Sequence, residues 1–340
     1  MNRFRDILDE MCSTGALSAS AAEQAFELIM SGQINDVSIG GFLTALRAIG
    51  ETSEVITAGA KVLRARLTPV QAPKNAIDTC GTGGDAKGSF NISTASAIVA
   101  AGAGAVVAKH GNKALSSRSG SSEVLERLGV RLDQPAGGVE RCMKQASIGF
   151  MFAPAHHAAM KYAAPARAQL GIRTIFNLLG PLSNPAGTTR QLLGVFDAKW
   201  TKPMAQTLAN LGAVRAWVVC GDDGMDELTT TTSSTVTELR DGTLFTFSLD
   251  PREFGFALAK PEALAGGEPQ DNADAITQLL DGKPGAFRDI VLLNTGAALL
   301  VAGLAKDLHQ GIAMANQAID SGKAKAALAK LVLVSNRDPQ

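Results

Sequence analysis

The sequence lacks three features that would assign it to a class of protein at once: a net charge, paired cysteines and a long apolar run. Its 32 Lys and Arg balance 32 Asp and Glu, so no overall field attracts nucleic acid or a membrane surface. Its four cysteines have no paired spacing, which argues against a disulfide framework or a zinc site and suits the cytosol. No apolar stretch is long enough for a signal peptide or a membrane span, so we expect a cytoplasmic protein.

What is present is the composition of a globular protein. The 340 residues are 46% hydrophobic and 19% charged, enough for a sizeable core and about two domains. Residues 1–70 indicate consecutive short helices. Ser20 and Glu23 form a predicted capping box, residues 37–49 place apolar side chains on one helical face, and Thr52 can cap the next helix.

After residue 75 the pattern changes to alternating strands and helices. A strand at 76–79, a helix at 93–101 and a strand at 105–109 predict a βαβ unit and therefore a parallel sheet. Asp241 and Gly242 are typical of a hairpin turn. Further predicted elements are strands at 217–220, 235–239 and 243–247, and helices at 162–179, 297–305, 308–321 and 324–334.

These elements predict an α/β fold in two parts. We expect a small helical domain of residues 1–70, joined by about 160–180. Beside it we expect a larger α/β domain of residues 71–159 and 181–340 with a mainly parallel sheet. Residues 251–285 are rich in Gly, Pro and Asp, and we predict an irregular connection there.

The strongest local signal is the sequence DTCGTGGD at residues 78–85, between a predicted strand and a predicted helix. Glycine amides there can approach an anion closely, and the start of the helix adds a favourable dipole. A dinucleotide site would need an acidic residue after the next strand, where Lys109 and His110 stand instead. A nucleotide P-loop would need a lysine before its serine, and Ser89 follows Gly88. A plain glycine-rich turn remains the alternative.

Two further polar segments follow predicted strand and helix boundaries. Residues 109–113 read KHGNK at the end of the second strand, and residues 116–121 read SSRSGS. Because ligands bind at the carboxyl ends of parallel strands, we expect these segments and the NIST sequence of residues 91–94 to form a polyanion site. The alternatives are a solvated serine loop, Ser93 or Thr94 serving only as helix caps, and a lysine in water.

The acidic segment GDDGMDE at residues 221–227 also follows a predicted buried strand. Carboxylates beside a polyphosphate suit hydrated Mg²⁺, although the segment alone favours a surface turn. His156 and His157 are adjacent and would point apart on a helix, so we do not predict a metal site from them.

Together these segments resemble the anthranilate phosphoribosyltransferase family, in order and over nearly the whole chain. The similar segments are GTGGD at 81–85, FNISTAS at 90–96, KHGN at 109–112 with the following serines, FAPAHH at 152–157, RTIFNLLGP at 173–181, and the pair Asp226 and Glu227. Three features depart from the family. Ser89 replaces a common threonine, and Lys113 replaces a usual arginine, losing a bidentate fork but not the charge. Residues 229–234 are unusually rich in hydroxyls, and we infer nothing from them.

The resemblance implies transfer of the phosphoribosyl group of 5-phosphoribosyl 1-pyrophosphate (PRPP) to anthranilate, in tryptophan biosynthesis. It also implies a Mg²⁺ cofactor, a homodimer and a site in the cleft between the two domains. The implied PRPP ligands are Gly81, Thr82, Gly84, Asp85, Ser89, Asn91, Ser93, Thr94, Lys109, Asn112, Ser117 and Ser121, with Lys109 and Asp85 catalytic. Gly81, Asn112 and Arg167 would contact anthranilate, and Ser93, Asp226 and Glu227 would serve the metal.

Two other functions are alternatives to phosphoribosyl transfer. A pyrimidine nucleoside phosphorylase of related fold would use inorganic phosphate, but its lysine loop differs from residues 109–112. A non-catalytic relative could bind nucleic acid, although the zero net charge and the acidic pair count against it.

Overall fold

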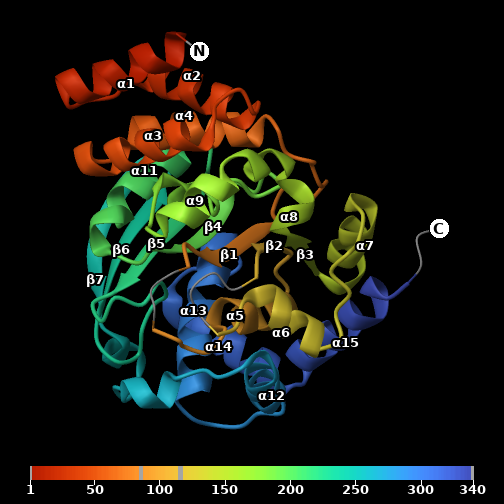
Figure 1. Ribbon diagram of the computed structural model, residues 1–340. Coiled ribbons are helices and arrows are strands. Elements are labelled where there is room, and N and C mark those ends of the chain that lie inside the picture. Colours follow the sequence, from red (N-terminus) through yellow and green to blue (C-terminus); the bar gives the residue numbers. More distant parts are fainter. Residues whose placement is uncertain (1, 84–86, 114–117, 338–340) are drawn as a thin grey trace.

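A seven-stranded sheet organises the computed structural model, which describes residues 2–83, 87–113 and 118–337. The strand order is β3-β2-β1-β4-β5-β6-β7, with β1 to β5 parallel and β6 and β7 antiparallel (Figure 1). The predicted βαβ unit and mainly parallel sheet are therefore confirmed. The strands are β1 Ile77–Gly81, β2 Val107–Gly111, β3 Ile148–Phe152, β4 Arg190–Gly194, β5 Arg215–Gly221, β6 Ser234–Arg240 and β7 Thr243–Leu249.

The hairpin between β6 and β7 turns at the predicted residues. Asp241 and Gly242 both have positive φ, at 52° and 76°, which is the turn that matches the twist of two antiparallel strands. β3 and β4 were missed from the sequence. β4 reads RQLLG, with two polar residues and no β-branched side chain, so its composition does not mark a strand.

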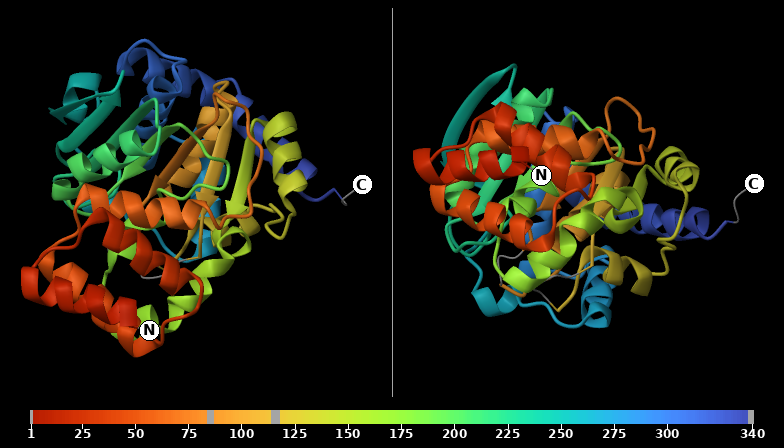
Figure 2. Two further views of the ribbon diagram at one scale, coloured as in Figure 1. Left: turned by 90° about the horizontal axis from the view of Figure 1, so that it is seen from above. Right: turned by 45° about the horizontal axis from the view of Figure 1, so that its top comes forward.

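The sheet lies between two hydrophobic layers because alternate residues of each strand face opposite sides. In β5, Trp217 and Val219 pack against the layer of α5 (Ile92–Gly102), α13 (Ala286–Ala302), α14 (Leu308–Asp320) and α15 (Lys323–Ser335). Ala216, Val218 and Cys220 face the other layer, which contains α11 (Thr201–Asn210) and the N-terminal helices. Figures 1 and 2 show the C-terminal helices and the N-terminal helices on opposite sides of the strands.

The N-terminal helices are α1 (Asn2–Thr14), α2 (Ala19–Met30), α3 (Asp36–Ile49) and α4 (Ser53–Arg64). Thr52 caps α4 as predicted, since its hydroxyl accepts the Val55 N–H. The capping box predicted at Ser20 is wrong. Ser18 is the cap of α2 and accepts the Ala21 N–H, which places Ser20 inside the first helical turn.

Residues 153–179 return to the N-terminal helices after β3. They form α8 (Ala153–His156), a 3₁₀ turn, α9 (Ala164–Leu170) and α10 (Ile175–Leu179). α9 and α10 are separate helices because Gly171 ends α9 with a left-handed φ of 60°. α9 packs on α3 and α10 packs on α4. The rings of Phe26 and Phe176 meet edge to face at 6.1 Å. The exact domain boundaries stay a prediction.

The predicted irregular connection at residues 251–285 is partly wrong. It contains two 3₁₀ turns and the helix α12 (Pro269–Leu280), which begins with Pro269 in its first turn. The glycines and prolines that suggested a loop stand before and after this helix, where proline and glycine favour starts and ends. α13 likewise begins at Ala286, well before the predicted start at residue 297. The short helices α6 (Ser121–Arg127) and α7 (Ala136–Ala146) were not predicted.

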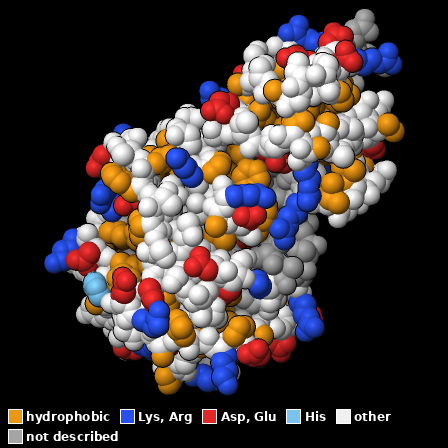
Figure 3. Space-filling view, turned by 90° about the vertical axis from the view of Figure 1, so that its left-hand side faces the viewer, with side chains coloured by type: hydrophobic (Ala, Val, Ile, Leu, Met, Phe, Trp, Pro, Cys, Tyr) orange, Lys and Arg blue, Asp and Glu red, His pale blue; other side chains and the backbone are white. Residues whose placement is uncertain are grey.

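Acidic and basic side chains are intermingled on the face shown in Figure 3, as expected from the balanced composition. In the described part of the chain, we find no helix with both the length and the apolar character that crossing a membrane requires.

Candidate active site

Four of the five parallel strands end in glycine: Gly81, Gly111, Gly194 and Gly221. A Cβ at Gly194 would lie 1.5 Å from the main-chain oxygen of Asp226, and one at Gly81 would lie 2.4 Å from its Oδ2. One at Gly221 would lie 2.4 Å from Oδ1 of Asp223, which stands with Asp226 in the acidic loop after β5. The missing side chains therefore let this loop close over the carboxyl ends of the strands, where α/β proteins bind ligands.

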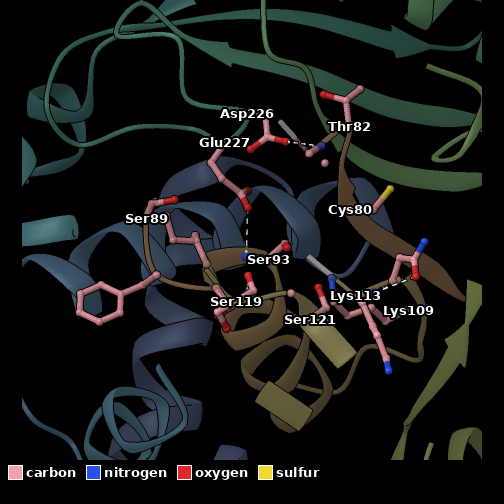
Figure 4. Close-up of a pocket in the computed structure, with 18 of the residues that line it drawn as sticks. Cys80, Thr82, Ser89, Ser93, Lys109, Lys113, Ser119, Ser121, Asp226 and Glu227 are labelled. Atoms are coloured by element: carbon pink, nitrogen blue, oxygen red, sulfur yellow. Dashed lines mark hydrogen bonds between the residues drawn. The ribbon is translucent and has the colours of Figure 1, made fainter. Parts of the chain in front are cut away.

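A polar cavity of about 240 Å³ lies under this loop. Its walls are the loop after β1, the start of α5, the loops after β2 and the acidic loop after β5 (Figure 4). The polar side chains that line it are Thr82, Ser89, Asn91, Ser93, Lys109, His110, Asn112, Lys113, Ser119, Ser121, Asn177, Asp226 and Glu227. Amides, hydroxyls and ammonium groups therefore surround a space suited to a polyanion.

Asp226 and Glu227, side by side on one loop, bond to two other segments that line this cavity (Figure 4). Asp226 Oδ2 accepts the Gly83 N–H at 2.8 Å, and Glu227 Oε1 accepts the Ser93 N–H at 3.0 Å. The interpretation of this segment as a surface turn is partly wrong: residues 221–224 do turn, with Asp222 exposed, but Glu227 is only 8% exposed. The pair ties the acidic loop to the glycine-rich loop and to the start of α5.

Lys109 enters the cavity from β2 and is almost fully buried. Its Nζ donates to the Thr79 carbonyl at 2.6 Å. Burial lowers the pKa of the Lys109 ammonium, while the charges of Asp78, Glu227 and Asp226 act in the opposite direction. The alternative of a strand-end lysine in water is therefore wrong.

Asn91 joins three segments at the start of α5. Its Oδ1 accepts the Ser119 hydroxyl at 3.1 Å and the Asn272 amide at 2.7 Å, and its own amide donates to the Ser119 carbonyl at 3.3 Å. Asn91 occupies the N-cap position, so the alternative that Ser93 or Thr94 caps this helix is wrong. Thr94 is fully buried and lines neither cavity, because successive helical residues point in different directions.

The segment with Ser89 is held extended by residues far along the chain. Ser89 pairs with Ala265 in an isolated antiparallel bridge, and the Phe90 N–H donates to the Leu264 carbonyl at 3.1 Å. The Gly266 N–H donates in turn to the Gly88 carbonyl at 2.8 Å. Part of the region predicted as a mere connection is thus the outer support of the cavity.

A second, more apolar cavity of about 590 Å³ adjoins the first. The two share Cys80, Gly81, Thr82, His110, Gly111, Asn112 and Asn177. The second adds Leu63, Ala153, Pro154, His157, Ala158, Met160, Lys161, Ala164, Arg167, Phe176, Gly180 and Pro181. The Arg167 guanidinium carbon lies 5.3 Å from the centre of the Phe176 ring, and burial lowers the pKa of Arg167.

Two histidines meet where the cavities join. His110 Nε2 and His157 Nε2 are 2.9 Å apart, so one nitrogen donates to the other. Burial lowers the pKa of His110 well below its usual range and that of His157 to about 4, and the neighbouring histidines lower both further. The pair is therefore neutral at physiological pH. Within the described ranges, no cluster of three potential metal-ligating His, Cys, Asp or Glu side chains occurs.

The structure brings most of the predicted site residues to these two cavities. Gly81, Thr82, Ser89, Asn91, Ser93, Lys109, Asn112, Ser121, Asp226 and Glu227 line the first, and Gly81, Asn112 and Arg167 line the second. Gly84, Asp85 and Ser117 lie outside the described residues. Apart from Arg167, no residue of the walls formed by residues 153–181 was predicted to have a role. Their family-like segments were the signal that could have found them.

The chain matches two parts of one enzyme class. Residues 5–67 match the helical bundle domain of a glycosyl transferase family, and residues 73–325 match the a/b domain of a glycosyl transferase family. A polyanion cavity at the carboxyl edge of the sheet agrees with a glycosyltransferase that uses a phosphorylated sugar donor.

Full-length relatives narrow the class. The anthranilate phosphoribosyltransferase of Maricaulis maris is 58% identical over 93% of this chain and 94% of that protein, and that of Parvibaculum lavamentivorans is 55% identical over 99% and 98%. The crystal structure of the Thermus thermophilus enzyme has a TM-score of 0.92 and 40% identity, covering 99% of this chain and all of that one. The Saccharomyces cerevisiae enzyme in complex with PRPP and Mg has a TM-score of 0.89 and 28% identity, covering 98% and 97%. The chain belongs to the anthranilate phosphoribosyltransferase family.

Proposed function

We propose that this protein transfers the phosphoribosyl group of PRPP to the amine of anthranilate, giving N-(5-phosphoribosyl)anthranilate and pyrophosphate in tryptophan biosynthesis. The observation that carries the proposal is a polar cavity adjoining an apolar one that contains Arg167. The two meet at Gly81 and Asn112, so a donor and an acceptor can touch there. The relatives support this transfer over the phosphorylase and nucleic-acid alternatives.

The polar cavity is the proposed PRPP site. The hydroxyls of Ser93 and Ser121 and the amide of Asn112 can bond to phosphate and ribose oxygens, and Lys113 adds a cation. Asp85, Gly84 and Ser117 remain predicted members of this site, and so does Thr94.

The donor set also fits Mg²⁺. Two carboxylates, Asp226 and Glu227, and the Ser93 hydroxyl line a cavity built for polyphosphate, and Mg²⁺ typically takes one or two carboxylates together with phosphate oxygens. When bound, the ion would neutralise charge on the pyrophosphate. The bonds to the Gly83 and Ser93 amides hold both carboxylates at this cavity.

The apolar cavity is the proposed anthranilate site. Arg167 can pair with the carboxylate of anthranilate, and Phe176 and Pro181 offer apolar surface to its ring. An enzyme of the same family from Saccharomyces cerevisiae has been solved in complex with 4-fluoroanthranilate, at 27% identity to this chain. Gly81 and Asn112 line both cavities, so the amine can face the ribose of PRPP across them.

The reaction needs positioning and charge stabilisation more than a strong base. As pyrophosphate leaves, positive charge develops on the ribose and negative charge on the leaving group. Lys109, fixed by the Thr79 carbonyl, opposes the negative charge. The aromatic amine of anthranilate is uncharged at neutral pH and attacks without prior deprotonation. Holding both substrates in neighbouring cavities supplies the remaining advantage, which is proximity.

The direct test is fluorescence. Anthranilate should lose its emission when the protein, PRPP and Mg²⁺ are mixed, and omission of any one should preserve it. Unchanged emission in the complete mixture, with pyrophosphate absent from the products, would refute the proposal. The homodimer implied by the family resemblance stays a prediction, and analytical ultracentrifugation measures it.

A further inference from the structure

A single asparagine in the middle of α13 bonds to the main chain directly after the acidic pair. Asn294 is fully buried. Its Oδ1 accepts the Leu228 N–H at 3.0 Å, and its amide donates to the Leu228 carbonyl at 2.8 Å and to the Ile290 carbonyl at 2.9 Å. One side chain thus holds both main-chain groups of the residue next to Glu227.

These bonds replace the partners that regular structure would supply. Leu228 lies between β5 and β6, outside any helix or strand, and it is itself fully buried. A buried main-chain N–H or carbonyl without a partner destabilises the folded chain. Asn294 bonds to both of these Leu228 groups. Its side-chain oxygen accepts one hydrogen bond and its amide group donates two, so this polar side chain has hydrogen-bond partners although it lies in the apolar layer around α13.

Other contacts also hold the acidic loop. Asp223 Oδ2 accepts the hydroxyls of Thr229 at 2.9 Å and Thr231 at 2.6 Å, which fixes the chain on either side of the acidic pair. Gly81 and Gly194 let Asp226 rest against the ends of β1 and β4. Asn294 contacts the loop from the layer of C-terminal helices, at the residue that follows Glu227.

We propose that Asn294 is a positioning residue that sets Asp226 and Glu227 in place for the metal-bound pyrophosphate, although it lines neither cavity. The inference rests on the function proposed above. Without Asn294, Leu228 must turn toward water or another partner to satisfy its main chain. Glu227 then shifts with it, and its bond to the Ser93 amide is lost.

The test compares Asn294→Leu with Asn294→Ser. Leucine has a similar shape and makes none of the three bonds. Serine can still donate to the Ile290 carbonyl within the helix but is too short to reach Leu228. The matched control is Ser335→Ala. Ser335 is a buried residue that lines neither cavity, and its hydroxyl accepts the part-buried Arg131 N–H, a bond that alanine removes.

Isothermal titration with PRPP, with and without Mg²⁺, is the first measurement, followed by steady-state kinetics and thermal unfolding. Both Asn294 variants should bind PRPP in Mg²⁺ at least about tenfold more weakly, since the lost bonds are worth more than about 1.4 kcal/mol. The Mg²⁺ concentration for half-maximal rate should rise, and the anthranilate KM should stay within about twofold. Ser335→Ala should keep wild-type binding.

The outcomes separate the two proposals. If the wild-type protein shows no Mg²⁺-dependent PRPP binding, the proposed function is wrong and this inference falls with it. If the wild type binds and the Asn294 variants keep its affinity and Mg²⁺ response, only the positioning role is wrong. Equal losses for both substrates, or failure of both variants to fold, would assign Asn294 to stability alone.

Discussion

Gly194→Ala is the smallest change that should displace the acidic pair. The added methyl group would lie 1.5 Å from the main-chain oxygen of Asp226 and 2.4 Å from its carbonyl carbon. Ordinary contact begins near 3.5 Å, so the loop must retreat by roughly 2 Å. The obstacle is main chain on both sides, because Gly194 is the last residue of β4 between β1 and β5, and no side chain can simply rotate away.

The expected loss of activity follows from this distance. Misplacing a catalytic group by about 1 Å can cost about a hundredfold in rate, or roughly 2.7 kcal/mol in the barrier. We therefore expect kcat/KM for PRPP to fall at least about a hundredfold. The hydrogen bond between the Gly83 N–H and Asp226 should be lost, and the Mg²⁺ concentration for half-maximal rate should rise.

The assay is initial-rate fluorescence at varied PRPP and Mg²⁺, with thermal unfolding of each variant. Gly137→Ala on α7 is the matched control, because a Cβ there meets no atom within 4 Å and should leave the kinetics unchanged. A Gly194→Ala protein with wild-type kcat/KM and Mg²⁺ response would refute the steric argument. If activity is lost only in proportion to unfolding of the protein, the loss does not come from displacement of the acidic pair.

Four further perturbations test other parts of the site. Asp226→Asn with Glu227→Gln should lower turnover at least about tenfold and weaken Mg²⁺ activation; an unchanged Mg²⁺ requirement would contradict the metal assignment. Arg167→Ala should raise the anthranilate KM about tenfold or more, from the loss of a charge-assisted bond of about 1.5–3 kcal/mol, with the PRPP KM little changed; equal effects on both would indicate a packing role. Lys109→Met should weaken PRPP binding and turnover while remaining folded, since methionine suits a buried position; wild-type donor kinetics would remove Lys109 from the mechanism. The pKa of His157 is depressed to about 4 in the folded protein, so the unfolded chain binds protons first as the pH falls below about 6.5. Stability should then decline between about pH 6.5 and 4 by at most about 1.4 kcal/mol per pH unit for this group, and His157→Gln should reduce the slope in denaturant unfolding.

The parts of the fold predicted from sequence are those with strong local signals. The strand, glycine-rich loop and helix around Gly81 could be predicted because glycine, apolar runs and helix starts follow one another in order. That several polar segments would meet could also be predicted, since parallel strands bring their carboxyl ends to one edge. Lys109 and the pair Asp226 and Glu227 met at that edge as expected.

The rest depended on contacts between distant segments. The second cavity is lined in large part by short helices in residues 153–181, whose position is set by packing of α9 on α3 and of α10 on α4. Asn272 and Asn294 look like ordinary helical asparagines until the structure shows Asn91 and Leu228 opposite them. Ser18 took the cap predicted for Ser20 because two serines stood within reach of the same helix start.

The pairing of Ser89 with Ala265 has a consequence for the order in which the chain is made. All seven strands have left the ribosome once residue 249 has emerged, yet residues 264–266, which hold residues 88–90 in place, have not been synthesised. Asn272 and Asn294, which hold Asn91 and the acidic loop, appear later still. A nascent chain therefore carries the whole phosphate-binding sequence while one face of its sheet waits for α13. Domains fold as units during synthesis, and in this one the contacts that hold Asn91 and the acidic loop are complete only once α13 has been made.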